Sequence, residues 1–470
     1  MLWSVLEHGS TTLISFLSLI VFAKFLEPRD FGAYAIAFSV IEIIGILPSN
    51  FFYEALVRLD KARDEHFNAA FTISMLLGIL AFGFLWLILP FLASLVNEPR
   101  ISELGKVLGV ALLITGPISI FTARQSREFG FRVLAQRTLI GRLAGAALGI
   151  LAAFYHLGVW ALVIQYLSMV VLGSTALVLF SSWWPRLTTK WRAAADLLHY
   201  GFGSVVALSA TFITKRAFGF YVGVFLGIEQ AGFLNLAFRI FDTVWAISAA
   251  AISEVMLPFM ARLQGDREKL LRAYCLTLVA GCLLLYPAFA GLGIVAPEVI
   301  QLMFGDKWIH AAQPSLWLGL LIFVQAPRIF QSSLLKISGN IDTVRSVNLT
   351  ALTVMIVGIA ATKLPSVTLA LVLWAVTETV NFVLLSFFVQ RKLHYPILKQ
   401  LRLILVPLLA SCAMVGAVAL GRAYLPPSHA LLQLFYLCGI GAVTYIGLIL
   451  LFGRRSLVNV VHGLRTPKAP

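Results

Sequence analysis

Long apolar runs are the feature that most constrains what this chain can fold into. About fourteen of them, each of roughly 20 residues, follow one another along the sequence. At ~1.5 Å of rise per residue, a helix of that length crosses the ~30 Å hydrocarbon core of a bilayer. The runs are continuous, whereas the strands of a membrane barrel would alternate polar and apolar residues. The sequence therefore predicts an all-α integral membrane protein with spans near 5–26, 33–53, 67–95, 104–122, 138–155, 158–180, 201–225, 232–257, 272–295, 311–335, 346–362, 366–389, 402–421 and 430–452.

The overall composition agrees with a membrane protein and gives no sign of catalytic chemistry. Hydrophobic residues make up 60% of the chain and charged residues only 12%, against roughly a quarter charged in soluble domains. No stretch between the predicted spans is longer than about 20 residues, which leaves no room for a soluble catalytic domain. The four cysteines lie inside apolar runs without metal-ligand spacing, and the eight histidines are scattered. We therefore expect no enzyme activity, no cofactor and no metal site.

Lysine and arginine are distributed very unevenly between the two sides of the predicted membrane. With a cytoplasmic N-terminus, the inner loops and the C-terminal tail carry 25 of the 36 Lys and Arg residues, and the outer loops carry seven. Positively charged loops stay on the cytoplasmic side, so this distribution predicts an even number of spans with both termini cytoplasmic. The net charge of +15 then reflects topology and attraction to anionic bilayer lipids, and it requires no nucleic-acid partner.

Two turns 200 residues apart indicate an internal repeat. The segment 25–38, FLEPRDFGAYAIAF, shares Phe, Leu, Gly, Ala and Phe in gapless register with 225–238, FLGIEQAGFLNLAF, and the same register places Glu42 opposite Asp242. Such duplication is typical of transporters that have two related halves. We expect two six-helix lobes related by a pseudo-twofold axis around a central cavity, plus two C-terminal helices. The predicted parts are an N-terminal lobe at 1–180, a cytoplasmic linker at 181–200, a second lobe at 201–391, and the last two spans with the tail at 392–470.

Several segments in fixed order resemble one transporter family. They are the LEPRDFGAY turn, ALVR, SREFGFRVLAQR, LGIEQAGFLNLAFRI, LPFMARLQGDREKLLRAY and LMFGDKWIHAAQPSL. Together they resemble the polysaccharide transporter, or Wzx-type flippase, family of the multidrug, oligosaccharidyl-lipid and polysaccharide exporter superfamily. The resemblance covers most of the first twelve spans. It implies a fourteen-helix flippase in the bacterial inner membrane, with undecaprenyl-diphosphate-linked oligosaccharide as substrate and a polysaccharide polymerase and chain-length or export components as further partners.

Seven charged residues lie toward the middle of predicted spans, where a charge costs at least ~2.5 kcal/mol and normally faces a partner or a wet cavity. We predict that the cations bind substrate and that the acids couple transport to an ion. One alternative is that Arg239 pairs with Asp242, and another is that Lys215 or Arg216 pairs with Glu378 or Glu42. Many members of the resembled family carry an acid where this chain has Lys215 and Arg216. The predicted substrate-binding residues are Lys215, Arg216, Arg239 and Arg328, and the predicted ion-coupling residues are Glu42, Asp242 and Glu378.

Three functions compete at this stage. A flippase for an anionic lipid-linked sugar predicts a cationic cavity, which the Lys215–Arg216 pair favours. A multidrug or cation extruder of the same superfamily would line its cavity with acids and aromatic residues and would usually have twelve spans. An integral membrane sugar transferase or polymerase would need a large outer loop or a convergent site of histidine and acid. The sequence favours the flippase.

Overall fold

The computed structural model describes residues 2–59, 62–188, 197, 213–362, 366–424 and 430–452. Within these ranges every regular element is helical, which confirms the predicted all-α class. Ten of the described helices are long and apolar enough to cross a membrane, or eleven if one bent pair forms a single span. Part of the predicted span at 201–225 lies outside the described residues.

The chain divides into two compact units. The first comprises Met1–Asn235 with Lys363–Pro365, and the second comprises Leu236–Thr362 with Ser366–Pro470. The boundary falls inside helix α8 (Ile228–Arg262), so the first two turns of α8 belong to the first unit.

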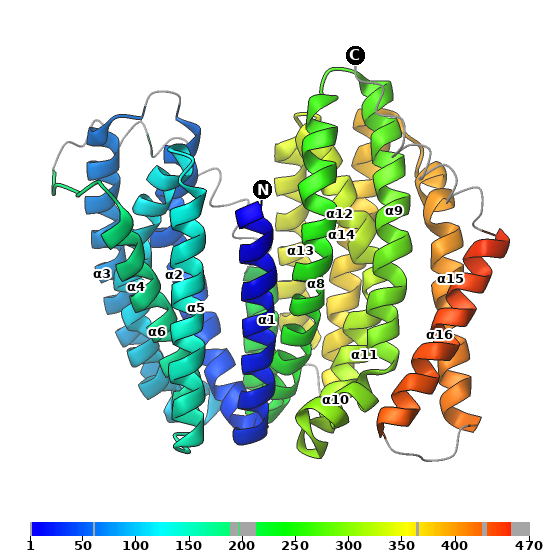
Figure 1. Ribbon diagram of the computed structural model, residues 1–470, viewed down its shortest axis with the longest axis horizontal. Coiled ribbons are helices and arrows are strands. Elements are labelled where there is room, and N and C mark those ends of the chain that lie inside the picture. The colour runs from blue at the N-terminus through cyan, green and yellow to red at the C-terminus, as the bar shows by residue number, and fades with distance from the viewer. Residues whose placement is uncertain are drawn as a thin grey trace. The chain divides into compact units, whose positions relative to one another are not determined.

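The first unit is a bundle in which α4 packs against α2 and α3, while α5 packs against α1 and α6 (Figure 1). Its turns follow ordinary helix-end chemistry. Pro28 occupies the first turn of α2, and the Asp30 carboxylate accepts the Glu27 backbone N–H at 3.2 Å. Asn97 ends α3 in the left-handed region at φ 54°. The helices are α1 (Leu2–Phe25), α2 (Pro28–Arg58), α3 (Asp64–Val96), α4 (Arg100–Arg127), α5 (Phe131–Phe154) and α6 (Trp160–Phe180), followed by a helical stretch at 213–226.

The described start of the predicted linker is fastened to this bundle. Trp183 is 8% exposed and packs in a cluster of aromatic and aliphatic side chains with Phe67 and Phe121. The backbone N–H of Arg186 donates to Asn68 Oδ1 on α3 at 2.9 Å. The described start of the linker is therefore part of the first unit.

The second unit is built around α9, which packs against α11, α12 and α15, while α14 packs against α12 and α13. The predicted span at 311–335 is not one straight helix, because two helical pieces, Asp306–Leu320 and Ile322–Ile337, meet at a 45° bend. The short helix α10 lies between the predicted spans at 272–295 and 311–335. Beyond α8 the elements are α9 (Arg267–Ile294), α10 (Ala296–Phe304), the 3-10 helix η1 (Asp306–Ala311), α11 (Ala312–Leu320), α12 (Ile322–Ile337), α13 (Ile341–Thr362), α14 (Val367–Leu393), α15 (Ile397–Tyr424) and α16 (Ala430–Phe452).

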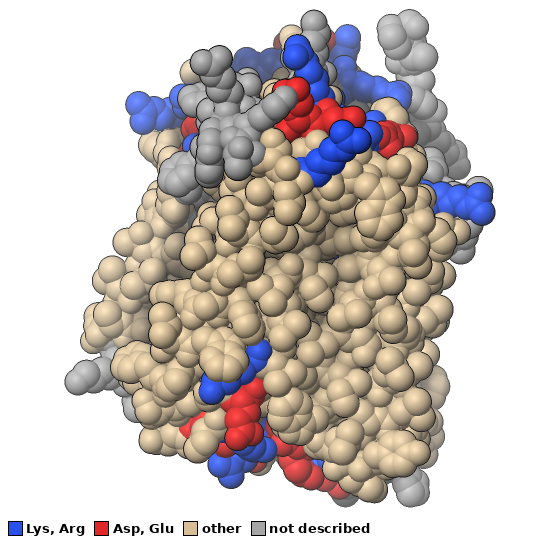
Figure 2. Space-filling view, turned by 90° about the vertical axis from the view of Figure 1, so that its left-hand side faces the viewer, with Lys and Arg blue, Asp and Glu red and all other residues tan. Residues whose placement is uncertain are grey.

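The surface carries the charge pattern of a membrane protein. On the face drawn in Figure 2, Lys, Arg, Asp and Glu side chains gather toward the two ends, and a broad band between them shows no charged side chains. Large apolar side chains of α3 are exposed within the span, including Leu80 at 68% and Leu87 at 81%. Such exposure would be costly in water and is expected where lipid tails cover the helix.

Candidate functional site

The structure places the seven predicted site residues on five helical stretches and brings four of them together as two ion pairs. One pair joins Glu42 and Arg216, and the other joins Arg328 and Glu378. Glu42 lies on α2, Lys215 and Arg216 lie on the stretch at 213–226, Arg239 and Asp242 lie on α8, Arg328 lies on α12, and Glu378 lies on α14.

In the first unit, Arg216 is held between a carboxylate and an aromatic ring. Its guanidinium forms an ion pair with Glu42, and the two side chains are 25% and 32% exposed. The same guanidinium lies over the ring of Phe38, with Cζ 5.5 Å from the ring centroid. Phe38 precedes Glu42 by one helical turn, so both side chains project from one face of α2. A guanidinium suits such a site because its flat face can stack on an aromatic ring while the N–H groups at its edge donate hydrogen bonds.

The ring of Phe38 is itself fixed by two tyrosines. The Tyr34 ring stacks on it at 5.3 Å between centroids, and the Tyr166 ring of α6 meets it edge-on at 4.9 Å. These contacts limit the movement of Phe38, because aromatic pairs prefer such offset and edge-on arrangements. The position of the Arg216 guanidinium is therefore set by side chains of both α2 and α6.

A cavity of about 170 Å³ opens beside this pair. Since a water molecule takes up about 30 Å³ of liquid volume, the space corresponds to about five or six waters. Sites for whole drug-sized ligands measure roughly 300–1,000 Å³. The cavity can therefore hold a small polar group such as a diphosphate but not an oligosaccharide. Its polar lining consists of Glu42, Ser49, Asn50, Thr115, Tyr166 and Arg216.

Three other predicted site residues, Lys215, Arg239 and Asp242, lie outside this ion pair. Lys215 is half-buried and projects about 100° around the helix from Arg216. Arg239 and Asp242 lie one turn apart on α8, where Arg239 is half-buried and Asp242 is exposed. Their proposed roles in substrate binding and ion coupling remain predictions.

In the second unit, Arg328 and Glu378 form a more deeply buried pair. Arg328 Nε lies 3.1 Å from Glu378 Oε2, and the side chains are only 16% and 12% exposed. Arg328 follows Pro327, whose missing N–H leaves the carbonyl of Phe323 without its helical donor. The hydroxyl of Tyr286 donates to that carbonyl at 3.1 Å. The freed backbone group is thus satisfied by α9, and the guanidinium of Arg328 is directed to a carboxylate on α14.

Neutral polar side chains one turn further along α12 and α14 form a second set of contacts between helices. Gln331, one turn after Arg328, donates through Nε2 to Ser386 Oγ at 2.8 Å and to Gln400 Oε1 at 3.1 Å. Asn381, one turn after Glu378, donates to Asn348 Oδ1 at 3.4 Å. These contacts connect α12, α13, α14 and α15 inside an apolar bundle, where an unpaired polar group is costly.

Sequence reasoning missed several of these residues. The aromatic frame of Phe38 and Tyr166, the cavity polar groups Asn50 and Thr115, and the pairing of Glu378 with Arg328 were not predicted. The available signal was weak, because amide and hydroxyl side chains inside an apolar run indicate a buried polar contact without indicating its partner.

A bundle of long apolar helices in two units, with charged pairs and a small, partly polar cavity inside the spans, is the architecture of a membrane transporter. Residues 21–313 match the family model described as polysaccharide biosynthesis protein. Since this match covers more than half of the chain, the protein belongs to that family.

Curated relatives and solved structures agree with this assignment. The chain is 25% identical to the succinoglycan biosynthesis transport protein ExoT of Rhizobium meliloti, over 100% of this chain and 96% of that protein. It is 22% identical to the lipopolysaccharide biosynthesis protein WzxC of Escherichia coli, over 65% and 64% of the two chains. The lipid II flippase MurJ in an inward closed conformation superposes with a TM-score of 0.75 at 14% identity, covering 97% of this chain and 99% of that one. An inward-facing multidrug resistance MATE family transporter gives 0.59 at 16% identity, covering 86% and 95%. At these identities the two solved structures show a shared fold.

Proposed function

We propose that this protein flips undecaprenyl-diphosphate-linked oligosaccharide units from the inner to the outer leaflet of the bacterial inner membrane. The observation that carries the proposal is the guanidinium of Arg216 beside a small polar cavity inside the spans of the first unit. The names of ExoT and WzxC, which concern succinoglycan transport and lipopolysaccharide biosynthesis, support a polysaccharide precursor as cargo.

The geometry suits recognition of the diphosphate part of such a lipid. Arg216 can present two parallel N–H donors to phosphate oxygens, and charge-assisted hydrogen bonds of this kind are roughly twice as strong as neutral ones. The cavity of about 170 Å³ has room for the diphosphate while the sugar and the polyprenyl chain lie outside it. Glu42 then holds the guanidinium when no substrate is bound, and substrate oxygens take over that contact.

The wider proposal assigns roles to the other intramembrane charges. Lys215, Arg239 and Arg328 provide further attraction for the anionic cargo, and Glu42, Asp242 and Glu378 couple its movement to an ion. Alternating access carries the site from one side to the other. A polysaccharide polymerase and chain-length or export components would use the product on the outer side.

Reconstitution tests the proposed activity directly. Proteoliposomes that hold the purified protein and a fluorescent undecaprenyl-diphosphate-linked oligosaccharide should expose inner-leaflet probe to an external quencher much faster than protein-free liposomes do. An undecaprenyl lipid that carries the same sugar without the diphosphate is the matched control and should move more slowly. Transport of an organic dye cation without lipid flipping would support a cation extruder instead, and a change in the sugar chain would support a transferase.

Orientation is part of the proposal, with both termini cytoplasmic. In intact cells, single cysteines at Asn97 and Leu157, in a background without the four native cysteines, should react with a membrane-impermeant maleimide. Both residues are exposed and lie in turns between helices of the first unit. Cysteines at Gln264 and Lys399, which are exposed just after α8 and in the first turn of α15, should react only after permeabilisation. The reverse labelling pattern would overturn the orientation.

A further inference from the structure

The first turns of α2 and α8 meet through two glycines. A Cβ atom on Gly32 would overlap the carbonyl oxygen of Ile228, and a Cβ atom on Gly232 would overlap the carbonyl oxygen of Pro28. The same Cβ on Gly232 would also lie 3.2 Å from the backbone nitrogen of Gly32. We call the contact formed by Pro28, Gly32, Ile228 and Gly232 the glycine seam. No side chain larger than hydrogen fits at either glycine while the seam is closed.

The glycine seam follows the internal repeat. Pro28 and Ile228 differ by 200 positions, as do Gly32 and Gly232, so each helix gives the other the same glycine face and the same carbonyl. The helix starts also correspond, since Phe31 N donates to Glu27 O at 3.3 Å and Ala231 N donates to Gly227 O at 3.2 Å. All of these residues belong to the first unit, whereas α8 continues into the second unit after Asn235. The glycine seam is thus where α8, a helix of the second repeat, contacts α2, a helix of the first repeat.

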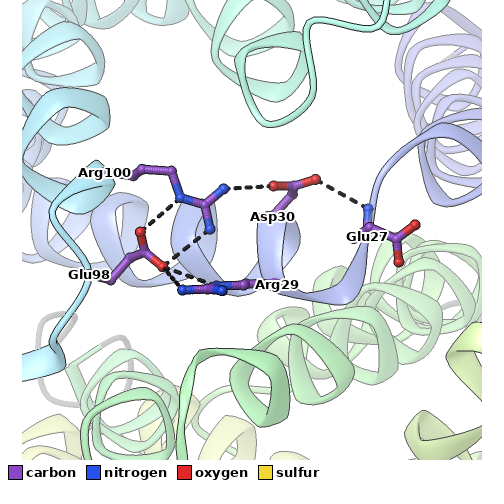
Figure 3. Close-up of polar contacts among 5 residues, drawn as sticks. All are labelled: Glu27, Arg29, Asp30, Glu98 and Arg100. Atoms are coloured by element: carbon purple, nitrogen blue, oxygen red, sulfur yellow. Dashed lines mark hydrogen bonds and ion pairs between the residues drawn. The ribbon is translucent and has the colours of Figure 1, made fainter.

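The other side of the first turn of α2 is held by a network of charges (Figure 3). Glu98, in the α3–α4 turn, accepts from Arg29 Nη2 at 2.8 Å and from Arg100 Nε at 2.8 Å. Arg100 Nη1 also donates to Asp30 Oδ1 at 3.1 Å. The Glu98 side chain is only 4% exposed, whereas its partners Arg29 and Arg100 are 64% and 39% exposed, so a shielded carboxylate meets guanidinium groups that reach the surface. The network ties the start of α2 to the start of α4.

The charge on Glu98 is stable at neutral pH. The hydrogen bond from Arg100, supported by Arg29, outweighs burial and lowers the pKa of the carboxyl below its ordinary 4.5. A lowered pKa in the folded state means that the network stabilises the fold above about pH 4.5. That contribution is lost only as the pH falls further, through the lowered pKa.

The two sides of α2 therefore differ greatly in how easily they can separate. If the charged network broke, the shielded Glu98 carboxylate would lose its partners, and a buried charge without a partner is costly. The glycine seam consists of backbone surfaces in close contact, and such surfaces lose only dispersion and weak Cα–H···O contacts when they part.

We propose that the glycine seam is the outer closure of the transport path, where α8 separates from α2 while α2 stays fixed to the α3–α4 turn by the Glu98 network. This inference rests on the proposed flippase function. It specifies which contact breaks during the cycle and which one does not.

Distance measurements between spin labels test this directly in the full chain. In nanodiscs, labels at Glu27 and Glu229, which are both exposed, span the seam, and labels at Glu27 and Asn97 span the charged network. We expect two populations of the Glu27–Glu229 distance in the otherwise native chain and a single Glu27–Asn97 distance. A single, unchanging Glu27–Glu229 distance would overturn the proposal, as would a Glu27–Asn97 distance that lengthens with it.

Glycine variants provide the second arm. Gly32→Ala or Gly232→Ala should raise the longer Glu27–Glu229 population severalfold, because the added methyl group cannot fit against backbone. Gly83→Ala is the matched control, since a Cβ there meets nothing within 4 Å. Gly105→Ala is a packing control, because its Cβ would press only on the flexible side chain of Leu89. Both controls should leave the distances unchanged, and equal effects of all four variants would overturn the proposal. If the seam distances behave as expected but no lipid is flipped, the proposed function fails and the seam stands.

Discussion

Replacing Arg216 by glutamine should slow flipping of the lipid-linked oligosaccharide by about 10- to 100-fold while membrane abundance stays near that of the parent chain. A hydrogen bond to a charged group contributes about 1.5–3 kcal/mol, and each ~1.4 kcal/mol corresponds to a factor of ten. Arg216 is the cation whose guanidinium borders the cavity, so its loss removes the fork that would bind the diphosphate. The initial flipping rate per molecule of protein in proteoliposomes is the measurement.

Three further variants show which property of Arg216 matters. Arg216→Lys keeps the charge but loses the planar fork, so we expect an intermediate rate. The double change of Lys215→Gln with Arg216→Gln should be slower than either single change. Lys106→Gln is the control, because Lys106 lies over the Trp86 ring at 4.9 Å, away from the cavity lining. Its flipping rate should match that of the parent.

Two outcomes would contradict this prediction. Normal flipping by the double variant would remove the anion site altogether. Low membrane abundance with a normal rate per molecule would show that Arg216 serves mainly as the structural partner of Glu42.

The sequence was a good guide to the fold because the relevant signals are local. Hydropathy over about 20 residues depends only on neighbours in the chain, and ten helices of the required length and apolarity follow from it among the described residues. The corresponding turns before α2 and α8 were recognised for the same reason, since proline and glycine act on their own backbone. Helices α9 and α14 likewise begin and end within about five residues of the predicted spans at 272–295 and 366–389.

The candidate site was much harder to predict, because it depends on which helix faces meet. Glu42 and Arg216 were both recognised as costly charges, and their pairing was one of several alternatives. Arg328 and Glu378 were also recognised, yet nothing in either segment points to the other. The carbonyl freed by Pro327 accepts a hydrogen bond from Tyr286 of α9, which no local signal indicates. Only the packing of α9 and α14 around α12 decides between these partners.

Breaking the Arg328–Glu378 ion pair should lower the free energy of unfolding of the protein more than any other substitution proposed for it. Glu378→Leu or Arg328→Met leaves one charge buried without its partner, and such a loss costs about 3–5 kcal/mol. The side chains are 16% and 12% exposed, so water can compensate only a small part. We expect a clear fall in the thermal unfolding temperature of the purified protein and in its membrane abundance.

The double variant, Arg328→Met with Glu378→Leu, should be considerably more stable than either single variant, because replacing a whole buried ion pair by apolar residues is often nearly neutral. Asp342→Asn is the matched control. Asp342 pairs with Arg345 at 3.3 Å, but its side chain is 84% exposed, and an exposed pair contributes at most about 1 kcal/mol. Single variants as mild as Asp342→Asn would show that the pair is well hydrated. A double variant that is stable but cannot flip lipid would show that the pair is needed for transport and is dispensable for folding, in agreement with a coupling role for Glu378.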